Sequence, residues 1–275
     1  MNIRFFLPLV FLFLLPALVF GQEQERSVQV GQHNSLEGFH NLQVLSGKNR
    51  LAAVVVDSPA VLRILHLGDS HVAAGQYSRA LADSLNRYFR QRKDSGRTLF
   101  DTVVVQVQAK NGATARSFLR NGYRSEAVTA FAPNLVVLSF GTNEANGPYQ
   151  PDSLAAGYQR FLQRLQADCP GADIIVTTAG DFFKKSRVAM PGLPAYVYRT
   201  NYDVQLLNTF LKFFAAGNNL ALWDWYTVMG GEGSVVRWHA YGFAREDRIH
   251  LTPEGYRLQG KLFATAIINF LNLVP

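Results

Sequence analysis

Short apolar runs alternate along most of the chain with segments whose apolar positions recur every three or four residues. Apolar runs rich in β-branched residues predict buried strands, and the recurring spacing predicts amphipathic helices. The predicted strands are 61–67, 102–107, 135–140, 173–178 and 220–225. The predicted helices are 77–89, 115–127, 153–167, 202–214 and 253–271. This order predicts an α/β fold in one domain, with a parallel sheet covered by helices on both faces.

The first 60 residues do not follow this alternation. Arg4, an apolar stretch over 5–20 and a small residue before Gln22 indicate that 1–21 is a secretory signal peptide. The stretch is shorter than the roughly 20 residues that span a bilayer, although a retained anchor is the alternative. Residues 22–60 are then an N-terminal extension, with a short helix over 36–45 and an edge strand or extended lead-in at 51–56. The folded domain is 61–275.

The composition fits an exported protein that is stabilised by its own core. Of 275 residues, 48% are apolar, which is enough for a well-filled domain. Cys169 is the only cysteine, so it cannot form an intramolecular disulfide, and we expect it to be buried. The net charge of +7 becomes +6 when Arg4 is removed, and no cluster of Lys or Arg suggests nucleic-acid binding. We therefore expect a periplasmic or extracellular protein with no nucleic-acid partner and no stable membrane anchor after signal cleavage.

Residues suited to ester chemistry follow three of the predicted strands. Ser70 follows the first, Gly112 the second and Asn143 the third. Asp247 and His250 stand just before the last predicted helix, close enough in sequence to hydrogen-bond to each other. In an open parallel sheet, ligands bind beyond the carboxyl ends of the strands. We therefore expect these five residues to meet at one edge of the sheet.

Each residue has a chemical role in such a site. Ser70 would be the nucleophile, His250 the general base and Asp247 the group that orients the imidazole. The backbone N–H groups of Ser70 and Gly112 and the side-chain amide of Asn143 would bind the oxyanion. Alternatively, these residues form turns and cap helices without doing chemistry.

Other residues are candidates for substrate contact. His71 and Glu144 flank the proposed site, and Glu144 could instead orient Asn143. The two segments 180–200 and 226–248 predict long loops that wall a binding site. The aromatic candidates from these loops for stacking on sugar rings are Phe182, Phe183, Trp238 and Tyr241. His66 and His71 are not accompanied by ligands at metal-binding spacing, so we expect no metal.

Taken together, the motifs resemble those of the SGNH (GDSL-like) hydrolase family. The four residues of its name match Ser70, Gly112, Asn143 and His250, and the resemblance covers about 61–275. It implies a three-layer α/β/α fold with a five-stranded, parallel, flavodoxin-like sheet, and no cofactor. The Gly68-Asp69-Ser70-His71 and 141–145 motifs are closest to those of bacterial envelope O-acetylesterases that act on peptidoglycan. Some of those enzymes insert a carbohydrate-binding β-domain, for which the roughly forty residues between Ser70 and Gly112 leave no room.

The resulting hypothesis is an exported serine esterase that removes O-acetyl groups from envelope carbohydrate through an acyl-enzyme. Its partner would be an acetylated glycan or another small ester. The alternatives are a lipase, lysophospholipase or thioesterase with the same triad, an O-acetyltransferase, and a glycan-binding module with an inert triad. The sequence leaves the oligomeric state open.

Overall fold

The computed structural model describes residues 34–43, 45, 60–93, 100–148, 150–187 and 196–273. The predicted signal peptide over 1–21 and the predicted strand at 51–56 lie outside these residues. So does most of the N-terminal extension.

The described residues form a main sheet of six strands and a separate hairpin of two. The strands of the main sheet are β1 (Leu36–Glu37), β2 (Val61–Gly68), β3 (Thr102–Ala109), β4 (Leu135–Ser139), β5 (Asp173–Thr177) and β8 (Ala221–Trp223). Their order is β1-β8-β5-β4-β2-β3. All neighbours are parallel except β1, which pairs antiparallel with β8. The parallel strands thus lie in the flavodoxin-like order second, first, third, fourth, fifth, and β1 adds an antiparallel edge.

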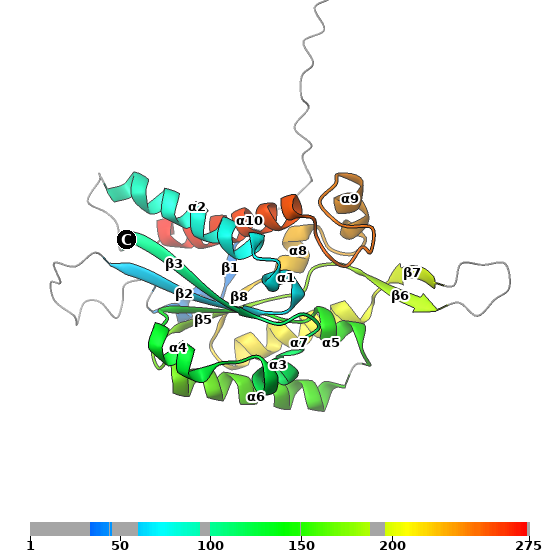
Figure 1. Ribbon diagram of the computed structural model, residues 1–275, viewed down its shortest axis with the longest axis horizontal. Coiled ribbons are helices and arrows are strands. Elements are labelled where there is room, and N and C mark those ends of the chain that lie inside the picture. Colours follow the sequence, from blue (N-terminus) through cyan, green and yellow to red (C-terminus); the bar gives the residue numbers. More distant parts are fainter. Residues whose placement is uncertain are drawn as a thin grey trace, which may run out of the picture.

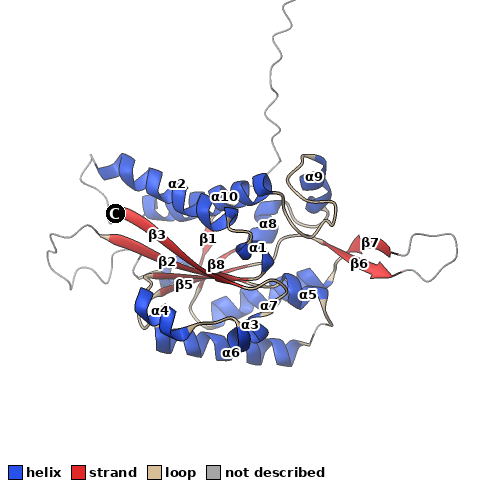
Figure 2. Cartoon of the chain, viewed as in Figure 1, coloured by secondary structure: helices blue, strands red, loops and turns tan. Residues whose placement is uncertain are grey.

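Helices cover both faces of the sheet, which gives three layers (Figure 1). The helices are α1 (Ser70–Ala73), α2 (Gln76–Lys93), α3 (Ala115–Asn121), α4 (Ser125–Phe131), α5 (Thr142–Asn146), α6 (Pro151–Asp168), α7 (Asp203–Gly217), α8 (Trp225–Met229), α9 (Ser234–Ala240) and α10 (Pro253–Leu273), with a 3-10 turn η1 (Phe39–Asn41). Helices α2 and α10 cover one face side by side, and α3, α4, α6 and α7 cover the other (Figure 2). The predicted three-layer α/β/α class is confirmed.

The sheet separates two apolar cores because successive strand residues point to opposite faces. In β2, Leu62 and Ile64 pack into the core beneath α2 and α10. Leu65 and Leu67 pack into the core on the α6 and α7 side. A strand that is apolar on both faces reads as a continuous run, which is why 61–67 was predictable from sequence.

Two predicted helices differ from the structure. The predicted helix over 36–45 is wrong, because β1 pairs with β8 and Gly38, with φ of 62°, turns the chain into η1. The predicted helix over 115–127 is two helices, α3 and α4. Helix α3 ends at Asn121, and Gly122 is its C-cap.

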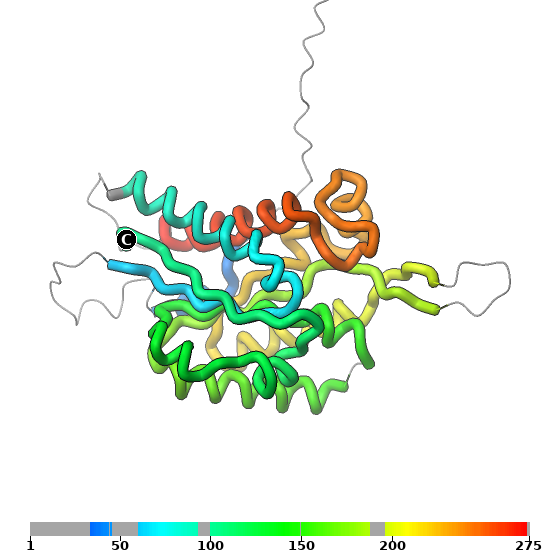
Figure 3. Tube along the Cα trace, viewed as in Figure 1, coloured from blue at the N-terminus to red at the C-terminus, as the bar shows by residue number. Residues whose placement is uncertain are grey.

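The two predicted long loops also contain regular structure. Strands β6 (Phe183–Arg187) and β7 (Tyr196–Thr200) form the two-stranded hairpin, which extends away from the body of the molecule (Figure 3). Helices α8 and α9 occupy much of 226–248. Among the described residues, no helix combines the length and apolarity that crossing a membrane requires.

Candidate active site

Ser70 stands just after the carboxyl end of β2, which lies between β4 and β3 in the sheet, at the first position of α1. The turn before it is tight: a Cβ on Gly68 would lie 2.2 Å from Val72 Cγ2 and 2.7 Å from the Ser139 carbonyl oxygen. Only glycine fits there. The Asp69 carboxylate then caps α1 by accepting the His71 backbone N–H at 3.0 Å. This local geometry leaves Ser70 half-exposed at the edge of the sheet.

Ser70, His250 and Asp247 form one hydrogen-bonded chain. Ser70 Oγ lies 3.0 Å from His250 Nε2, and His250 Nδ1 lies 2.7 Å from Asp247 Oδ2. The second carboxylate oxygen of Asp247 accepts the backbone N–H groups of Ile249 at 3.0 Å and His250 at 2.9 Å. These bonds fix the loop so that the imidazole faces the serine.

The protonation state of Asp247 suits this arrangement. Partial burial alone would raise the pKa of its carboxyl, but the hydrogen bonds from the His250 side chain and from two backbone N–H groups outweigh burial and lower it. The carboxylate therefore stays ionised near neutral pH and holds a proton on Nδ1. Nε2 is left free to accept the proton of Ser70.

Side chains of α5 join the loops that follow β2 and β3. Asn143 Nδ2 donates to the Ala113 carbonyl oxygen at 2.9 Å and to Asp69 Oδ2 at a longer 3.3 Å. Glu144 Oε1 accepts the Ala115 backbone N–H at 2.7 Å. The structure thus brings Asn143 beside the serine turn. An oxyanion at Ser70 would compete with Asp69 for the more weakly bound N–H of this amide.

Gly112 lies on the loop that Asn143 and Glu144 hold. Its φ is +73° and no atom lies within 4 Å of the position of a Cβ, so glycine is favoured there by backbone conformation and not by crowding. The residue is exposed. Its backbone is therefore open to close approach by a substrate.

The Glu144 carboxyl is buried beneath the loop that carries Gly112. Burial raises the pKa of its carboxyl to about 7, although the Ala115 N–H opposes this. Glu144 Oε1 binds the backbone next to the Gly112 loop, whereas the two roles expected from sequence, substrate contact and orientation of Asn143, stay predictions. Glu144 Oε2 is buried with no partner among the described residues.

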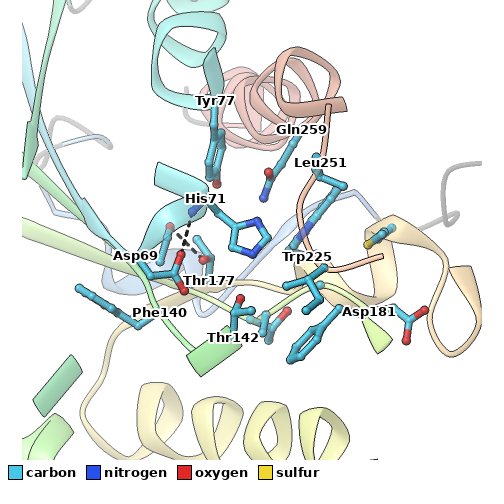
Figure 4. Close-up of a pocket in the computed structure, with 17 residues that line it drawn as sticks. Asp69, His71, Tyr77, Phe140, Thr142, Thr177, Asp181, Trp225, Leu251 and Gln259 are labelled. Atoms are coloured by element: carbon cyan, nitrogen blue, oxygen red, sulfur yellow. Dashed lines mark hydrogen bonds between the residues drawn. The ribbon is translucent and has the colours of Figure 1, made fainter. Parts of the chain in front are cut away.

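His71 lies behind the triad. Its ring stacks on that of His250, with centroids 5.3 Å apart and planes at 25°. Nδ1 lies 3.1 Å from the Tyr256 hydroxyl, and burial lowers the pKa of His71 to about 3. Figure 4 shows the ring pointing into a small cavity near Tyr77 and Gln259, with a volume of about 40 Å³. Neither ring nitrogen is available to a substrate in this arrangement, so the predicted substrate contact is not supported.

Two of the four predicted sugar-stacking residues are corrected. Trp238 is 0% exposed and donates its indole N–H to the Met229 carbonyl oxygen at 3.0 Å. Phe182 is 2% exposed and belongs to the core. Neither ring can meet a sugar. Tyr241 is 40% exposed, and Phe183 is half-buried at the base of the hairpin.

A larger cavity of about 430 Å³ begins at Asn143. Apart from Asn143 and Glu144, the residues that line it were not predicted from sequence, because they are scattered over α3, α5, α6 and the adjoining loops. Its lining residues are Thr114, Arg116, Ser117, Arg120, Asn143, Glu144, Gly147, Pro148, Gln150, Ser153, Leu154 and Tyr158. Most of these groups are polar, and Arg116 donates to Ser153 Oγ at 2.7 Å.

Among the described residues, no group of three or more His, Cys, Asp or Glu side chains is placed to hold a metal ion. The absence of a metal remains a prediction. Tyr256, which sequence analysis did not single out, supports His71 from the first turns of α10. Tyr256 was not predicted from sequence because it belongs to the apolar face of α10, where an aromatic residue is expected to be part of the core.

Comparison with known proteins places this fold and site in a family. Residues 66–258 match the model of the GDSL-like lipase/acylhydrolase family. The chain therefore belongs to this family of SGNH hydrolases, as its motifs predicted, and is an ester hydrolase. No curated protein sequence matches the chain.

Solved structures share the fold at low sequence identity. One is titled "Peptidoglycan O-acetylesterase in action", with a TM-score of 0.65, 14% identity, and coverage of 86% of this chain and 96% of the other. A second is a catalytic mutant of Axe2, an acetylxylan esterase from Geobacillus stearothermophilus. Its TM-score is 0.56 at 16% identity, and the match covers 77% of this chain and 96% of the other. A third is the acetyl xylan esterase AlAXEase, with a TM-score of 0.52 and 19% identity. The match covers 74% of this chain and 98% of the other.

Proposed function

We propose that this protein is an exported serine esterase that removes O-acetyl groups from carbohydrate of the cell envelope, of the peptidoglycan type. The observation that carries the proposal is the continuous path from Ser70 Oγ to His250 at 3.0 Å and from His250 to Asp247 at 2.7 Å. A serine hydroxyl is a weak nucleophile until a neighbouring base takes its proton. Ser70, His250 and Asp247 are the catalytic residues of the proposal.

The reaction proceeds through an acetyl-enzyme. Ser70 Oγ attacks the acetyl carbonyl carbon while His250 Nε2 takes the hydroxyl proton. The bond from that carbon to the sugar oxygen breaks, and the sugar hydroxyl leaves with the proton from Nε2. His250 Nε2 then takes a proton from water, which attacks the acetyl carbon. The bond from that carbon to Ser70 Oγ breaks, acetate leaves, and Nε2 returns the proton to Ser70 Oγ. Asp247 stabilises the imidazolium in both halves.

Three donors serve the tetrahedral intermediates. They are the backbone N–H groups of Ser70 and Gly112 and the Asn143 amide. The Asn143 side chain is already held near Ser70 through its 3.3 Å bond to Asp69 Oδ2. Donors fixed before the reaction stabilise developing charge without reorganisation.

The surroundings favour a short acyl group on a polar alcohol over a lipid ester. Nine of the twelve residues that line the cavity beginning at Asn143 have polar side chains, among them the guanidinium groups of Arg116 and Arg120. The His250 and Asp247 side chains are 33% and 38% exposed, so an acetyl group on a bulky polymer can reach them. The fold neighbours described as a peptidoglycan O-acetylesterase and acetylxylan esterases agree with this choice.

Export rests on the sequence of residues 1–21, with its basic start, apolar centre and small residue before Gln22. This part of the proposal is tested by fractionating cells that produce the protein and finding which fraction contains it. Recovery of the mature chain, starting near Gln22, from the periplasm or medium is expected. An intact chain in the cytoplasm would contradict it.

The substrate is tested by acetate release from O-acetylated peptidoglycan, with acetylated xylan as the comparison polymer and Ser70→Ala as the control. We expect faster release from peptidoglycan and none above background with Ser70→Ala. Faster release from xylan would overturn the choice of glycan. Equal release by Ser70→Ala would overturn the mechanism.

A further inference from the structure

The hairpin β6–β7 carries a face of cations and tyrosines. In its register, Lys185 lies opposite Tyr198 and Arg187 lies opposite Tyr196. Directly opposed residues, and residues two apart on one strand, project from the same side of a sheet. These four side chains therefore share one face of the hairpin, which is called here the hairpin face.

The hairpin face is open to solvent. Tyr196 is 50% exposed and Tyr198 is 36% exposed, and Lys185 and Arg187 are exposed as well. The Lys185 ammonium lies 4.3 Å from the centre of the Tyr196 ring. These rings add little to the apolar cores, so folding alone does not account for them.

The charge of the hairpin has one sign. Its described residues, 183–187 and 196–200, include four cations and no carboxylate. Lys184, on the opposite face, pairs with Asp203 at 3.0 Å, whereas Lys185 and Arg187 extend along the open face. The field over this face attracts an anionic partner.

The base of the hairpin is joined to the loop that carries the triad. The Phe183 backbone N–H donates to the Arg248 carbonyl oxygen at 3.0 Å. The Arg248 guanidinium lies 5.8 Å from the centre of the Phe183 ring. Arg248 stands between Asp247 and His250 in sequence, so the hairpin starts next to the active site and extends outward from it (Figure 1).

We propose that the hairpin face binds an anionic polysaccharide strand of the cell envelope and holds it while Ser70 acts on an acetyl group farther along the strand. Tyrosine rings offer flat apolar faces to sugars, and Lys185 and Arg187 pair with carboxylates on the strand. The choice of this partner rests on the proposed function. It would supply polymer recognition, since the segment between Ser70 and Gly112 is too short for an inserted β-domain.

A saccharide strand fits this face better than a lipid surface does. Both exposed aromatic residues of the face are tyrosines of β7, and its described residues include no Leu, Ile or Trp to insert among acyl chains. The spacing of about 7 Å between residues two apart on a strand places the rings in a row. An extended polymer can follow such a row.

The test measures binding separately from catalysis. In the Ser70→Ala background, the full chain is sedimented with insoluble peptidoglycan at several salt concentrations. We expect the double variants Lys185→Ala/Arg187→Ala and Tyr196→Ala/Tyr198→Ala each to weaken binding by about tenfold or more. The matched control is Arg199→Ala, which removes an exposed cation from the opposite face and should bind within about twofold of the parent. Binding of the parent should weaken as salt rises.

Kinetics complete the test with Ser70 restored. Both double variants should hydrolyse p-nitrophenyl acetate at the parent rate and melt at the parent temperature, but release acetate from the polymer more slowly at low polymer concentration. Parent-like sedimentation of both double variants would overturn the proposal. So would binding to phosphatidylglycerol vesicles that exceeds binding to peptidoglycan. If no acetylated glycan is a substrate of the wild type, the proposed function fails, while sedimentation still decides the binding surface.

Discussion

The Asn143 side chain joins two parts of the proposed oxyanion site. It holds the Ala113 carbonyl oxygen at 2.9 Å and reaches Asp69 Oδ2 at 3.3 Å. We predict that Asn143→Ala lowers kcat for p-nitrophenyl acetate by roughly 100-fold to 1,000-fold with little change in KM, because an oxyanion donor acts mainly in the transition state. Steady-state kinetics measure the split. A rise in KM at unchanged kcat would mean that Asn143 binds the ground state instead.

Glu144 should make stability depend on pH. The pKa of its carboxyl is raised from 4.5 to about 7 in the folded protein, so the folded state binds this proton more tightly than the unfolded state. Stability from this group is therefore lost as pH rises from about 5 to 8. We predict that Glu144→Gln, whose amide oxygen can still accept the Ala115 N–H, loses less thermal stability over this range than the wild type does.

The window from pH 6.5 to 8 isolates this effect. Burial lowers the pKa of His66 and of His71 to about 3, so in this window they change protonation only in the unfolded state, and to the same extent in both proteins. Asp69, with a pKa raised by burial to about 7, titrates in both proteins. If the melting temperatures of wild type and Glu144→Gln change equally with pH across this window, titration of Glu144 does not affect stability and the prediction is wrong.

Single residues were predictable where the reaction requires a particular residue type just after a strand or just before a helix. Ser70, Asn143 and the Asp247–His250 pair follow from strand ends and from a helix start. The roles of His71 and Trp238 did not follow, because sequence shows which residues are near the site but not which way a side chain points. His71 turns back onto His250, and Trp238 turns into the core, where it packs edge-on against Trp225.

The packing of α2 against α10 positions the element that follows the catalytic loop. A Cβ on Gly260 would lie 2.4 Å from the Tyr77 carbonyl oxygen and 2.8 Å from Ala80 Cβ. We predict that Gly260→Ala destabilises the protein by about 1–2 kcal/mol, since overpacking of roughly 1–3 kcal/mol exceeds the gain of up to about 1 kcal/mol in helix propensity.

Calorimetry checks this with a matched control. Gly217, the last residue of α7, has no atom within 4 Å of the position of a Cβ. Gly217→Ala should leave the melting temperature unchanged or slightly higher, while Gly260→Ala lowers it by several degrees. If Gly260→Ala melts at the wild-type temperature, the two helices do not pack as closely as described.

Elements were predictable where apolar periodicity is long and uninterrupted, as in β2 and α10. Predictions failed where pairing with a distant segment decided the conformation. Leu36 and Leu42 read as one helical stripe, but Leu36 pairs with Trp223 in β8, far away in sequence. The hairpin was missed because its strands bury little, and because neither FKKSR over 183–187 nor YVYRT over 196–200 alternates between apolar and polar residues.

At the scale of the whole molecule, the parallel sheet collects the ends of β2, β3 and β4 at one edge, and the loop before α10 supplies His250 there. This convergence follows from strand order, so the place of the site was predictable from sequence. The shape of its surroundings was not, because the cavity at Asn143 combines side chains from three helices. Cavity shape depends on packing between elements, which no local pattern encodes.

The polar walls of that cavity lead to a prediction about acyl length. Along a series of p-nitrophenyl esters, we expect kcat/KM to be highest for acetate and to fall at least about tenfold by the octanoate, because an octanoyl chain would desolvate the guanidinium and amide groups that line this cavity. Initial rates at low substrate concentration, below micelle formation, measure this. A rate that climbs with chain length would indicate a lipase or thioesterase instead.

The central claim is that Ser70 is a nucleophile activated by His250, and covalent labelling tests it most directly. The protein is treated with a fluorophosphonate, and the modified peptide is located by mass spectrometry, with His250→Ala and Ser70→Ala alongside. The account predicts one adduct on Ser70 in the wild type, much slower labelling of His250→Ala and none of Ser70→Ala. An unlabelled wild type, or an adduct on another residue, would contradict it.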